Sequence, residues 1–320
     1  MDKRGRMLGT IDVATSSGLE IGPLHLPLVH RSEGRVLYVD YADADTLRAN
    51  FRHQGDPADI VDVDIVWGSR PLLELLDHPV DYILASHVIE HVPDLIGWLM
   101  ELHAILRPGG ILGLAIPDRS RTFDVRRQVS SPGEMVEAWL LGYRRPSIRQ
   151  VFEAAALSKD RDDKEDWILG TSKSGLPDEV RSRLQNALDL SKSLLTEPRY
   201  IDVHAWVFTI ESFLDTAEAL HLMGCVPFAI EAFYPTEPGQ IEFQVRLRAI
   251  GNEDTAVEDS IKAARESLRE VLPIGHMPDL QTPEPEGVTN AFRHLIKTIL
   301  GPRGLALARN CKRRFAPEQV

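Results

Sequence analysis

Between Gly18 and about Ala249, short apolar runs alternate with longer segments of helical periodicity. An apolar run of about four to eight residues between turn residues is typical of a buried strand, and strands that alternate with helices are typical of a doubly wound parallel sheet. We therefore predict an α/β fold with a doubly wound, mostly parallel sheet. Four runs form its predicted buried strands: Gly18–Ile21, Arg35–Asp40, Val80–Ala85 and Ile111–Ile116. Residues 60–67 could add another strand.

A helix is predicted between the last two of these strands. Asp94 can cap its first turn, and leucines three or four residues apart fall on one face before a Pro-Gly-Gly turn at residue 108 ends it. After Pro117 the sequence becomes polar and helix-favouring, and we interpret residues 119–200 as a helical cap inserted into the domain. Two strand-like runs at 226–233 and 241–248, joined by a turn-rich segment, predict an antiparallel pair at the edge of the sheet.

The chain is predicted to divide into a domain at residues 1–250 and a C-terminal helical tail at residues 251–320. The tail contains a linker rich in proline and glutamate and has a basic end. An apolar stripe from Phe292 to Leu300 carries basic residues beside it. Such a stripe could contact an anionic membrane surface peripherally, contact a protein partner, or dock against its own domain.

Composition and charge narrow the class of protein. With 43% apolar and 26% charged residues, the 320-residue chain can bury a sizeable core. The net charge of −12 argues against general nucleic-acid binding, so no nucleic-acid partner is expected. Two distant cysteines exclude a disulfide scaffold and a four-thiolate zinc site, which fits a cytoplasmic location. No apolar run reaches the roughly 18 residues that span a bilayer, and the basic N-terminus lacks the apolar segment of a signal peptide.

The end of the second predicted strand carries a candidate nucleoside ligand. In doubly wound sheets the ligand lies beyond the carboxyl ends of the strands, where an acidic residue can accept hydrogen bonds from a ribose. Asp40 closes this strand and lies twenty positions after Glu20, which belongs to the first strand. The glycine-rich run that cradles a pyrophosphate is missing after Gly22, which argues against a dinucleotide dehydrogenase.

Two further segments identify a family. Residues 85–94 read Ala-Ser-His-Val-Ile-Glu-His-Val-Pro-Asp, and residues 106–112 read Leu-Arg-Pro-Gly-Gly-Ile-Leu. Between Gly18 and Leu247 the chain resembles the class I S-adenosylmethionine-dependent methyltransferases, which implies a Rossmann-like fold and S-adenosylmethionine as the cofactor. The resemblance further implies the cofactor-binding residues: Glu20, Gly22 and the adjoining Pro23 at the methionine end, Asp40 at the ribose, Tyr41 and Ser69 near the adenine, and Ser86 and His87 beneath the sulfonium.

Transfer of a methyl group to a hydroxyl requires that the hydroxyl lose its proton to a base or through a metal. The candidate groups are His87, His91, Asp118 and His204. His204 precedes a Phe-Thr-x-Glu-Ser segment that resembles the one bringing a histidine over the acceptor pocket in this family. We expect His204 to be the general base, with His87 as the competing candidate.

The residues His87, Glu90 and His91 would share one face of a helical turn. Some methyltransferases hold a metal at this location, but His87 replaces a carboxylate there and Mg²⁺ prefers oxygen ligands, so we expect no metal and a role for Glu90 and His91 in fixing the turn. The pattern His-x-x-Glu-His is also that of inverted zinc peptidases. That alternative needs a long helix, whereas Pro93 closes this turn.

The opening from Glu20 to Leu28 resembles that of bacterial family members associated with surface-polysaccharide assembly. It implies O-methylation of a sugar hydroxyl, with a glycan or another small molecule as acceptor. Small phenolic compounds and other metabolites are left open. The remaining alternative is a methyltransferase-like scaffold without catalytic activity, because the loop after Gly22 lacks the further glycines of the family.

Overall fold

The computed structural model describes residues 1–52, 55–68, 70–159, 178–251 and 256–271. Residues Met1–Val271 form one compact unit, and the fold below is that of this unit. The predicted adenine contact Ser69 and the apolar stripe of the tail lie outside the described residues.

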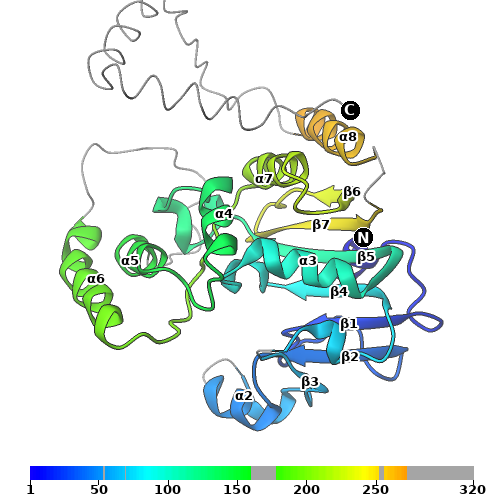
Figure 1. Cartoon of the computed structure of the whole chain (residues 1–320), viewed down its shortest axis with the longest axis horizontal. Helices are drawn as coiled ribbons and strands as arrows, with labels where there is room; N and C mark the ends of the chain where they lie inside the picture. Colours follow the sequence, from blue (N-terminus) through cyan, green and yellow to red (C-terminus); the bar gives the residue numbers. More distant parts are fainter. Residues whose placement is uncertain (53–54, 69, 160–177, 252–255, 272–320) are drawn as a thin grey trace, which may run out of the picture. The chain divides into compact units, whose positions relative to one another are not determined.

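A seven-stranded sheet runs through the described residues in the order β3-β2-β1-β4-β5-β7-β6, which Figure 1 shows from bottom to top. The first five strands of this order are parallel, and β7 is antiparallel to both of its neighbours. The predicted doubly wound sheet with an antiparallel edge pair is therefore confirmed. The strands are β1 (Ser17–Ile21), β2 (Arg35–Asp40), β3 (Ile65–Val66), β4 (Val80–Ser86), β5 (Leu106–Pro117), β6 (Phe228–Tyr234) and β7 (Glu242–Ala249).

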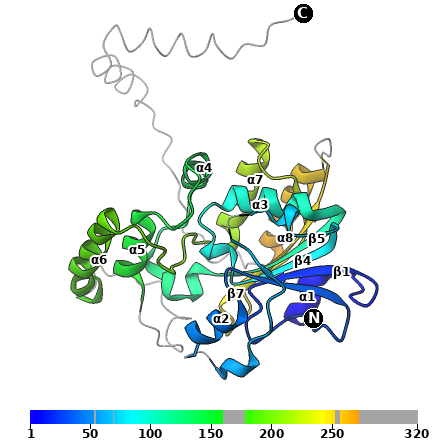
Figure 2. The same ribbon diagram turned by 60° about the horizontal axis from the view of Figure 1, so that its bottom comes forward.

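The helices surround this sheet and extend beyond it. The helix predicted after Asp94 is present, and Asp94 caps it by accepting a hydrogen bond from the backbone N–H of Gly97 (2.9 Å). Figure 2 and Figure 1 show α5 and α6 side by side at one end of the strands. The helices are α1 (Lys3–Leu8), α2 (Ala44–Asn50), α3 (Leu95–Ile105), α4 (Pro132–Leu140), α5 (Ile148–Leu157), α6 (Asp178–Thr196), α7 (Ile210–Leu222) and α8 (Ala256–Val271).

Each face of the sheet buries a separate apolar cluster. Because side chains alternate along a strand, Ile83 and Ala85 of β4 point to one face, and Tyr82 and Leu84 point to the other. The first face packs against α3, α7 and α8, and the second against α1 through Met7. A strand buried on both faces shows as a continuous apolar run, which is why the sequence revealed it.

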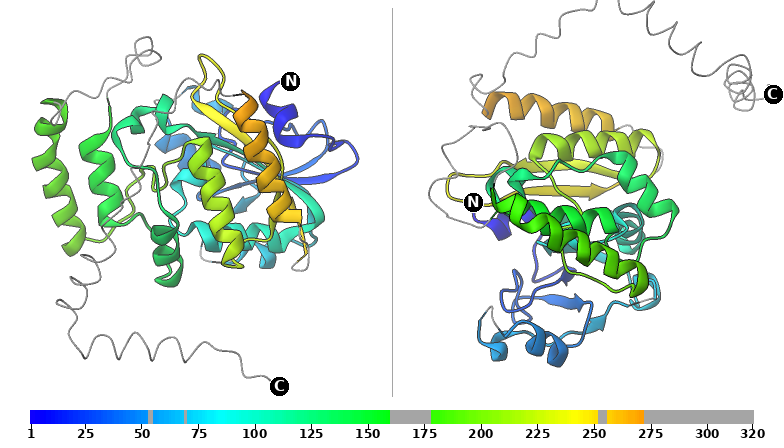
Figure 3. Two further views of the ribbon diagram at one scale, coloured as in Figure 1. Left: turned by 90° about the horizontal axis from the view of Figure 1, so that it is seen from above. Right: turned by 90° about the vertical axis from the view of Figure 1, so that its left-hand side faces the viewer.

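The helix α8 belongs to this unit, which extends past the predicted boundary at residue 250 to Val271. Its apolar positions, Val257 and Ile261 among them, are buried in the core. Ser260 Oγ accepts a hydrogen bond from the backbone N–H of Ile230 (3.0 Å), and Arg265 forms ion pairs with α7. Figure 3 shows α7 and α8 side by side.

The inserted cap leaves and rejoins the sheet at one place. Asp118, just after β5, forms a parallel bridge with Phe208, and the backbone N–H of Arg119 donates to the carbonyl of Phe208 (2.7 Å). The backbone N–H of Asp118 also donates to the carbonyl of Ile241 (2.8 Å).

Among the described helices, none has both the length and the apolar character needed to cross a bilayer.

Candidate functional site

The carboxyl ends of β1, β2 and β4 meet at one edge of the sheet. Asp40, the last residue of β2, is 6% exposed and accepts a hydrogen bond from the backbone N–H of Tyr41 (2.7 Å). Burial raises the pKa of Asp40 from 3.8 to about 6, although the Tyr41 N–H works against this rise. A buried carboxylate at a strand end is suited to accept hydrogen bonds from ribose hydroxyls, so Asp40 has the expected position.

Gly22 turns the chain directly after β1. Its φ is +66°, and a Cβ at this position would lie 3.0 Å from Val88 Cγ2. Its backbone N–H donates to the carbonyl of Val39 (2.9 Å), which fixes the turn against β2. Glycine is the residue that adopts this conformation without strain, and the absence of a Cβ avoids the close contact with Val88.

Glu20 is buried beneath the loop that follows this turn. Its carboxylate accepts hydrogen bonds from the backbone N–H groups of Leu28 (2.7 Å) and Val29 (3.1 Å). Burial raises the pKa of Glu20 from 4.5 to about 7, because desolvation outweighs these bonds. Glu20 therefore holds the loop that begins at Pro23, and its predicted contact with the methionine end stays a prediction.

His87 follows Ser86 at the end of β4 and has a φ of +56°. This left-handed conformation is uncommon for residues other than glycine and turns the imidazole toward β7, where Nε2 lies 2.5 Å from Glu242 Oε2. Lys3 also donates to that oxygen (2.9 Å). Burial acts to raise the pKa of Glu242, but His87 and Lys3 lower it to about 2.

Tyr41, the residue predicted to pack near the adenine, is 58% exposed, and its hydroxyl accepts a hydrogen bond from Asn50 (3.2 Å).

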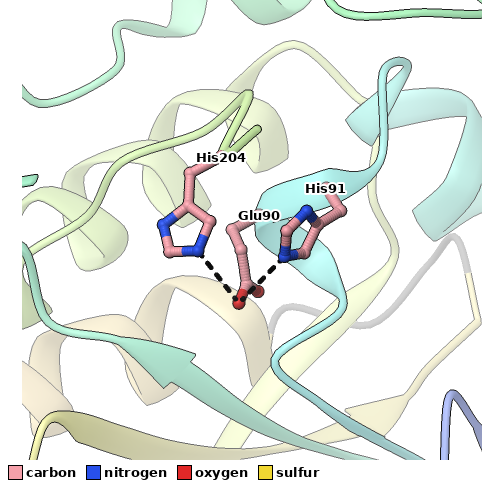
Figure 4. A group of neighbouring side chains, drawn as sticks. All are labelled: Glu90, His91 and His204. Atoms are coloured by element: carbon pink, nitrogen blue, oxygen red, sulfur yellow. Dashed lines mark ion pairs between the residues drawn. The ribbon is translucent and has the colours of Figure 1, made fainter. Parts of the chain in front are cut away.

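Three metal-capable side chains converge where the turn after β4 meets the segment returning from the cap (Figure 4). Glu90 and His91 lie on the single 3₁₀ turn Ile89–His91, and His204 lies on the returning segment. The Nε2 atoms of His91 and His204 each lie 3.9 Å from Glu90 Oε1. One ligand atom from each residue lies within 4.8 Å of the others.

A carboxylate oxygen lies close to the Nδ1 atom of each imidazole of this cluster. His204 Nδ1 lies 2.5 Å from Asp124 Oδ2, and His91 Nδ1 lies 2.9 Å from Asp202 Oδ1. The 1% exposed Arg127 donates to Asp124 Oδ1 and to the carbonyl of His204, both at 2.8 Å. These contacts leave the Nε2 atoms facing Glu90.

The backbone of Glu90 joins the two segments. Its carbonyl accepts hydrogen bonds from the backbone N–H groups of Ala205 (2.6 Å) and Trp206 (3.1 Å), and the Trp206 indole donates to the carbonyl of Val92 (2.5 Å). The Glu90 side chain is 1% exposed, and no group in the described part of the chain donates a hydrogen bond to either of its oxygens. Among these residues it therefore lacks the hydrogen bonds that buried carboxylates normally accept, and the imidazole nitrogens at 3.5–3.9 Å are its polar neighbours.

The structure thus brings all three predicted catalytic histidines to Glu90: His91 and His204 face Oε1 with Nε2, and His87 lies 3.5 Å from it with Nδ1 while its Nε2 contacts Glu242. The carboxyl group of Asp118 accepts from Ser120 and from Thr236 Oγ1 (2.7 Å) instead of reaching this cluster. Residues 85–94 do not form the long helix that an inverted zinc-peptidase site needs.

The carboxylates Asp124, Asp202 and Glu242 were not predicted from the sequence. Asp202 could have been found because it lies two residues before His204 in the segment already singled out. Asp124 and Glu242 meet their histidines only through the tertiary fold, and nothing in the local sequence marks them.

Comparisons with known proteins find similarity to methyltransferases. The family model described as a methyltransferase domain matches residues 16–160. Demethylmenaquinone methyltransferases of Listeria welshimeri and Listeria monocytogenes are each 30% identical to this chain over 104 residues, which is 32% of the chain and 39% of each relative. The chain thus spans about two fifths of the length of these curated relatives.

Solved structures of methyltransferases also align with the chain. A S-adenosylmethionine-dependent methyltransferase from Mesorhizobium loti is 16% identical with a TM-score of 0.36, over 74% of this chain and 93% of that one. The CcbJ methyltransferase from Streptomyces caelestis is 15% identical with a TM-score of 0.28, over 40% and 52%. The family-model match thus identifies residues 16–160 as similar to a methyltransferase domain, within which Gly22 directly follows β1 and Asp40 ends β2.

Proposed function

We propose that the protein transfers a methyl group from S-adenosylmethionine to a hydroxyl group of a small acceptor, with a sugar hydroxyl as the leading candidate. The observation that carries this proposal is the methyltransferase-domain match over residues 16–160, which covers the strand ends at Gly22 and Asp40 and the turn at Glu90. The buried cluster at that turn supplies groups that could act on an acceptor.

The residues at the strand ends fit the cofactor. Asp40 would accept hydrogen bonds from the ribose, Gly22 would leave room beside the methionine part, and Tyr41 would pack near the adenine. When bound, S-adenosylmethionine supplies an electrophilic methyl group on a positively charged sulfur, which becomes a neutral thioether once the methyl group has passed to the acceptor oxygen.

The contribution of this chain is to orient the acceptor and to remove its proton. Alignment of the attacking oxygen with the methyl carbon supplies much of the acceleration of such a displacement. The proton must also leave the hydroxyl, and the cluster at the end of β4 offers the imidazoles of His91 and His204 for this step. Asp124 and Asp202 lie 2.5 and 2.9 Å from the Nδ1 atoms of these rings and would orient Nε2 for this step.

Aromatic side chains beside the cluster support a sugar acceptor. Tyr200 is 49% exposed, and its hydroxyl donates to the carbonyl of His91 (3.3 Å). The ring of Phe123 lies 4.7 Å from that of His204. The exposed face of Tyr200 can stack on a sugar ring, whereas Phe123 is half-buried as a neighbour of His204. Trp139 and Tyr143, by contrast, pack against the core.

Calorimetric titration with S-adenosylhomocysteine tests the cofactor assignment. The wild type should bind it, and Asp40→Asn should weaken binding about ten- to a hundredfold, since charge-assisted hydrogen bonds contribute about 1.5–3 kcal/mol. Asp45→Asn on α2 is the matched control, because its side chain is 95% exposed. Absence of binding heat in the wild type would favour the non-catalytic scaffold. Methyl transfer to nitrogen or carbon, detected by NMR of the product, would contradict the hydroxyl acceptor.

A further inference from the structure

We propose that Glu90, His91 and His204 form a binding site for a divalent transition-metal ion of the zinc class. The first support is geometric. In a tetrahedral site with bonds near 2.1 Å, ligand atoms lie about 3.4 Å apart. The two distances from imidazole Nε2 to Glu90 Oε1 are both 3.9 Å, and all three ligand atoms lie within 4.8 Å of one another, so the ligand atoms would have to approach by at most about 1.4 Å to complete the coordination.

The orientation of the two imidazoles gives a second support. Metal-bound histidines usually have their other ring nitrogen held by a carboxylate or carbonyl, which fixes the ring and raises its basicity. Asp124 contacts Nδ1 of His204, and Asp202 contacts Nδ1 of His91. Both remaining nitrogens therefore point at the same carboxylate oxygen (Figure 4).

The side chain of Glu90 gives a third, independent support. It is 1% exposed, and neither oxygen accepts a hydrogen bond from the described residues. The nearest imidazole nitrogen, Nδ1 of His87, lies 3.5 Å from Oε1. A buried carboxylate without donors is costly unless a cation compensates it. A divalent ion between Glu90 and the two imidazoles would supply that charge.

The donor set selects the kind of ion. Two nitrogen ligands and one carboxylate suit Zn²⁺, Fe²⁺ or Co²⁺ better than Mg²⁺, which prefers oxygen. Three protein ligands leave a position open to another molecule, as in catalytic zinc sites. The sequence argument against a metal placed His87 in the ligand set. In the structure His204 takes that place, because His87 Nε2 contacts Glu242.

The role of the ion toward the acceptor rests on the proposed function. A hydroxyl bound at the open position would lose its proton more readily, because a bound cation lowers the pKa of an oxygen ligand. His204 would then be a metal ligand, and the ion would replace it as the group that activates the hydroxyl.

Metal binding can be measured without any methyl transfer. We expect the full-length chain, stripped with a chelator, to bind one Zn²⁺ in equilibrium dialysis and one Co²⁺ with a visible d–d absorption band. His91→Ala, His204→Ala and Glu90→Gln should each lose the band. His78→Ala is the matched control, because His78 is exposed and lies outside the cluster, and it should bind like the wild type.

Asp202→Asn separates a metal site from a structural cluster. Its side chain is 65% exposed, so the fold should tolerate the change, while metal affinity should fall about ten- to a hundredfold. Unchanged Co²⁺ stoichiometry and absorption in the three cluster variants would overturn the proposal, as would a wild type that binds neither ion. Thermal denaturation checks that the variants fold. If an alanine variant does not fold, Glu90→Gln still tests the site, because glutamine keeps the shape of the glutamate side chain.

The same protein samples keep this result distinct from the proposed function. Titration of the stripped wild type with S-adenosylhomocysteine reports cofactor binding alone. Metal binding without cofactor binding would reject the methyltransferase activity and keep the metal site. Cofactor binding without metal binding would reject the metal site and keep the methyltransferase proposal.

Discussion

Replacing Asp40 by asparagine should make the protein more stable and its cofactor binding weaker. The carboxyl group of Asp40 is buried, and burial raises its pKa from 3.8 to about 6. Above this pH the folded protein must keep a charge in a place that disfavours it. Asparagine has nearly the same shape and retains an oxygen that can accept the hydrogen bond from Tyr41, but it carries no charge.

The size of the effect follows from proton linkage. A carboxyl group with a raised pKa in the folded state stabilises the fold most below its unfolded pKa, and this contribution is lost as the pH rises through the folded pKa. At about 1.36 kcal/mol per pH unit, a rise from 3.8 to about 6 corresponds to about 3 kcal/mol. Asp40→Asn should therefore increase the free energy of unfolding by about 3 kcal/mol at about pH 8 and by about half of that at about pH 5.

Urea denaturation followed by tryptophan fluorescence at both pH values measures this difference. Asp45→Asn serves again as the control and should change the free energy of unfolding by less than about 0.5 kcal/mol. A decrease in the stability of Asp40→Asn at the higher pH, or the same gain at both, would refute the linkage argument. Stronger S-adenosylhomocysteine binding by the variant would refute the ribose contact.

Two further substitutions test the turn and the buried ion pair. Gly22→Ala should lower the free energy of unfolding by about 1–2 kcal/mol in urea denaturation, because φ is +66° there, whereas Gly68→Ala, with open space around it, should lower it less. Equal effects of the two changes would contradict the strained turn. Arg127→Met removes the guanidinium from the buried Asp124 and leaves His204 Nδ1 as its partner, so we expect a loss of about 3–5 kcal/mol in the same assay. A loss below about 1 kcal/mol would mean that His204 is sufficient to stabilise the buried Asp124.

Most of the sheet could be predicted because its central strands are buried on both faces. Their apolar runs coincide with β1, β2, β4 and β5 to within a few residues. The predicted strand at residues 60–67 is only β3, Ile65–Val66. Before it, Asp64 pairs with Tyr38 through its side chain as well as its backbone, and such local bonding competes with a strand ladder. The helix α1 could not be predicted, because it has six residues and buries only Met7 and Leu8, which is too few for a helical apolar period.

The candidate site could be predicted only where its residues are close in the sequence. Glu90 and His91 stood out in one motif, and His204 in another. His87 does lie beside Glu90, as predicted, but not through a regular helical turn, because its left-handed backbone places Nδ1 3.5 Å from Glu90 Oε1 and turns Nε2 to Glu242 of β7. Nothing in the sequence reports such a tertiary partner. The predicted roles of these histidines in catalysis stay predictions.

The bridge between Asp118 and Phe208 has a consequence for how acceptor choice can change. It brings the two ends of the inserted segment together, so the entropy of closing that loop depends only logarithmically on its length, at about 0.6 kcal/mol for each doubling. Asp124 and Arg127 lie a few residues after Asp118, and His204 lies a few residues before Phe208. Helices from α4 to α6 could therefore be exchanged or lengthened between these stems, as interchangeable parts that alter what reaches the site while its histidines and carboxylates stay where they are.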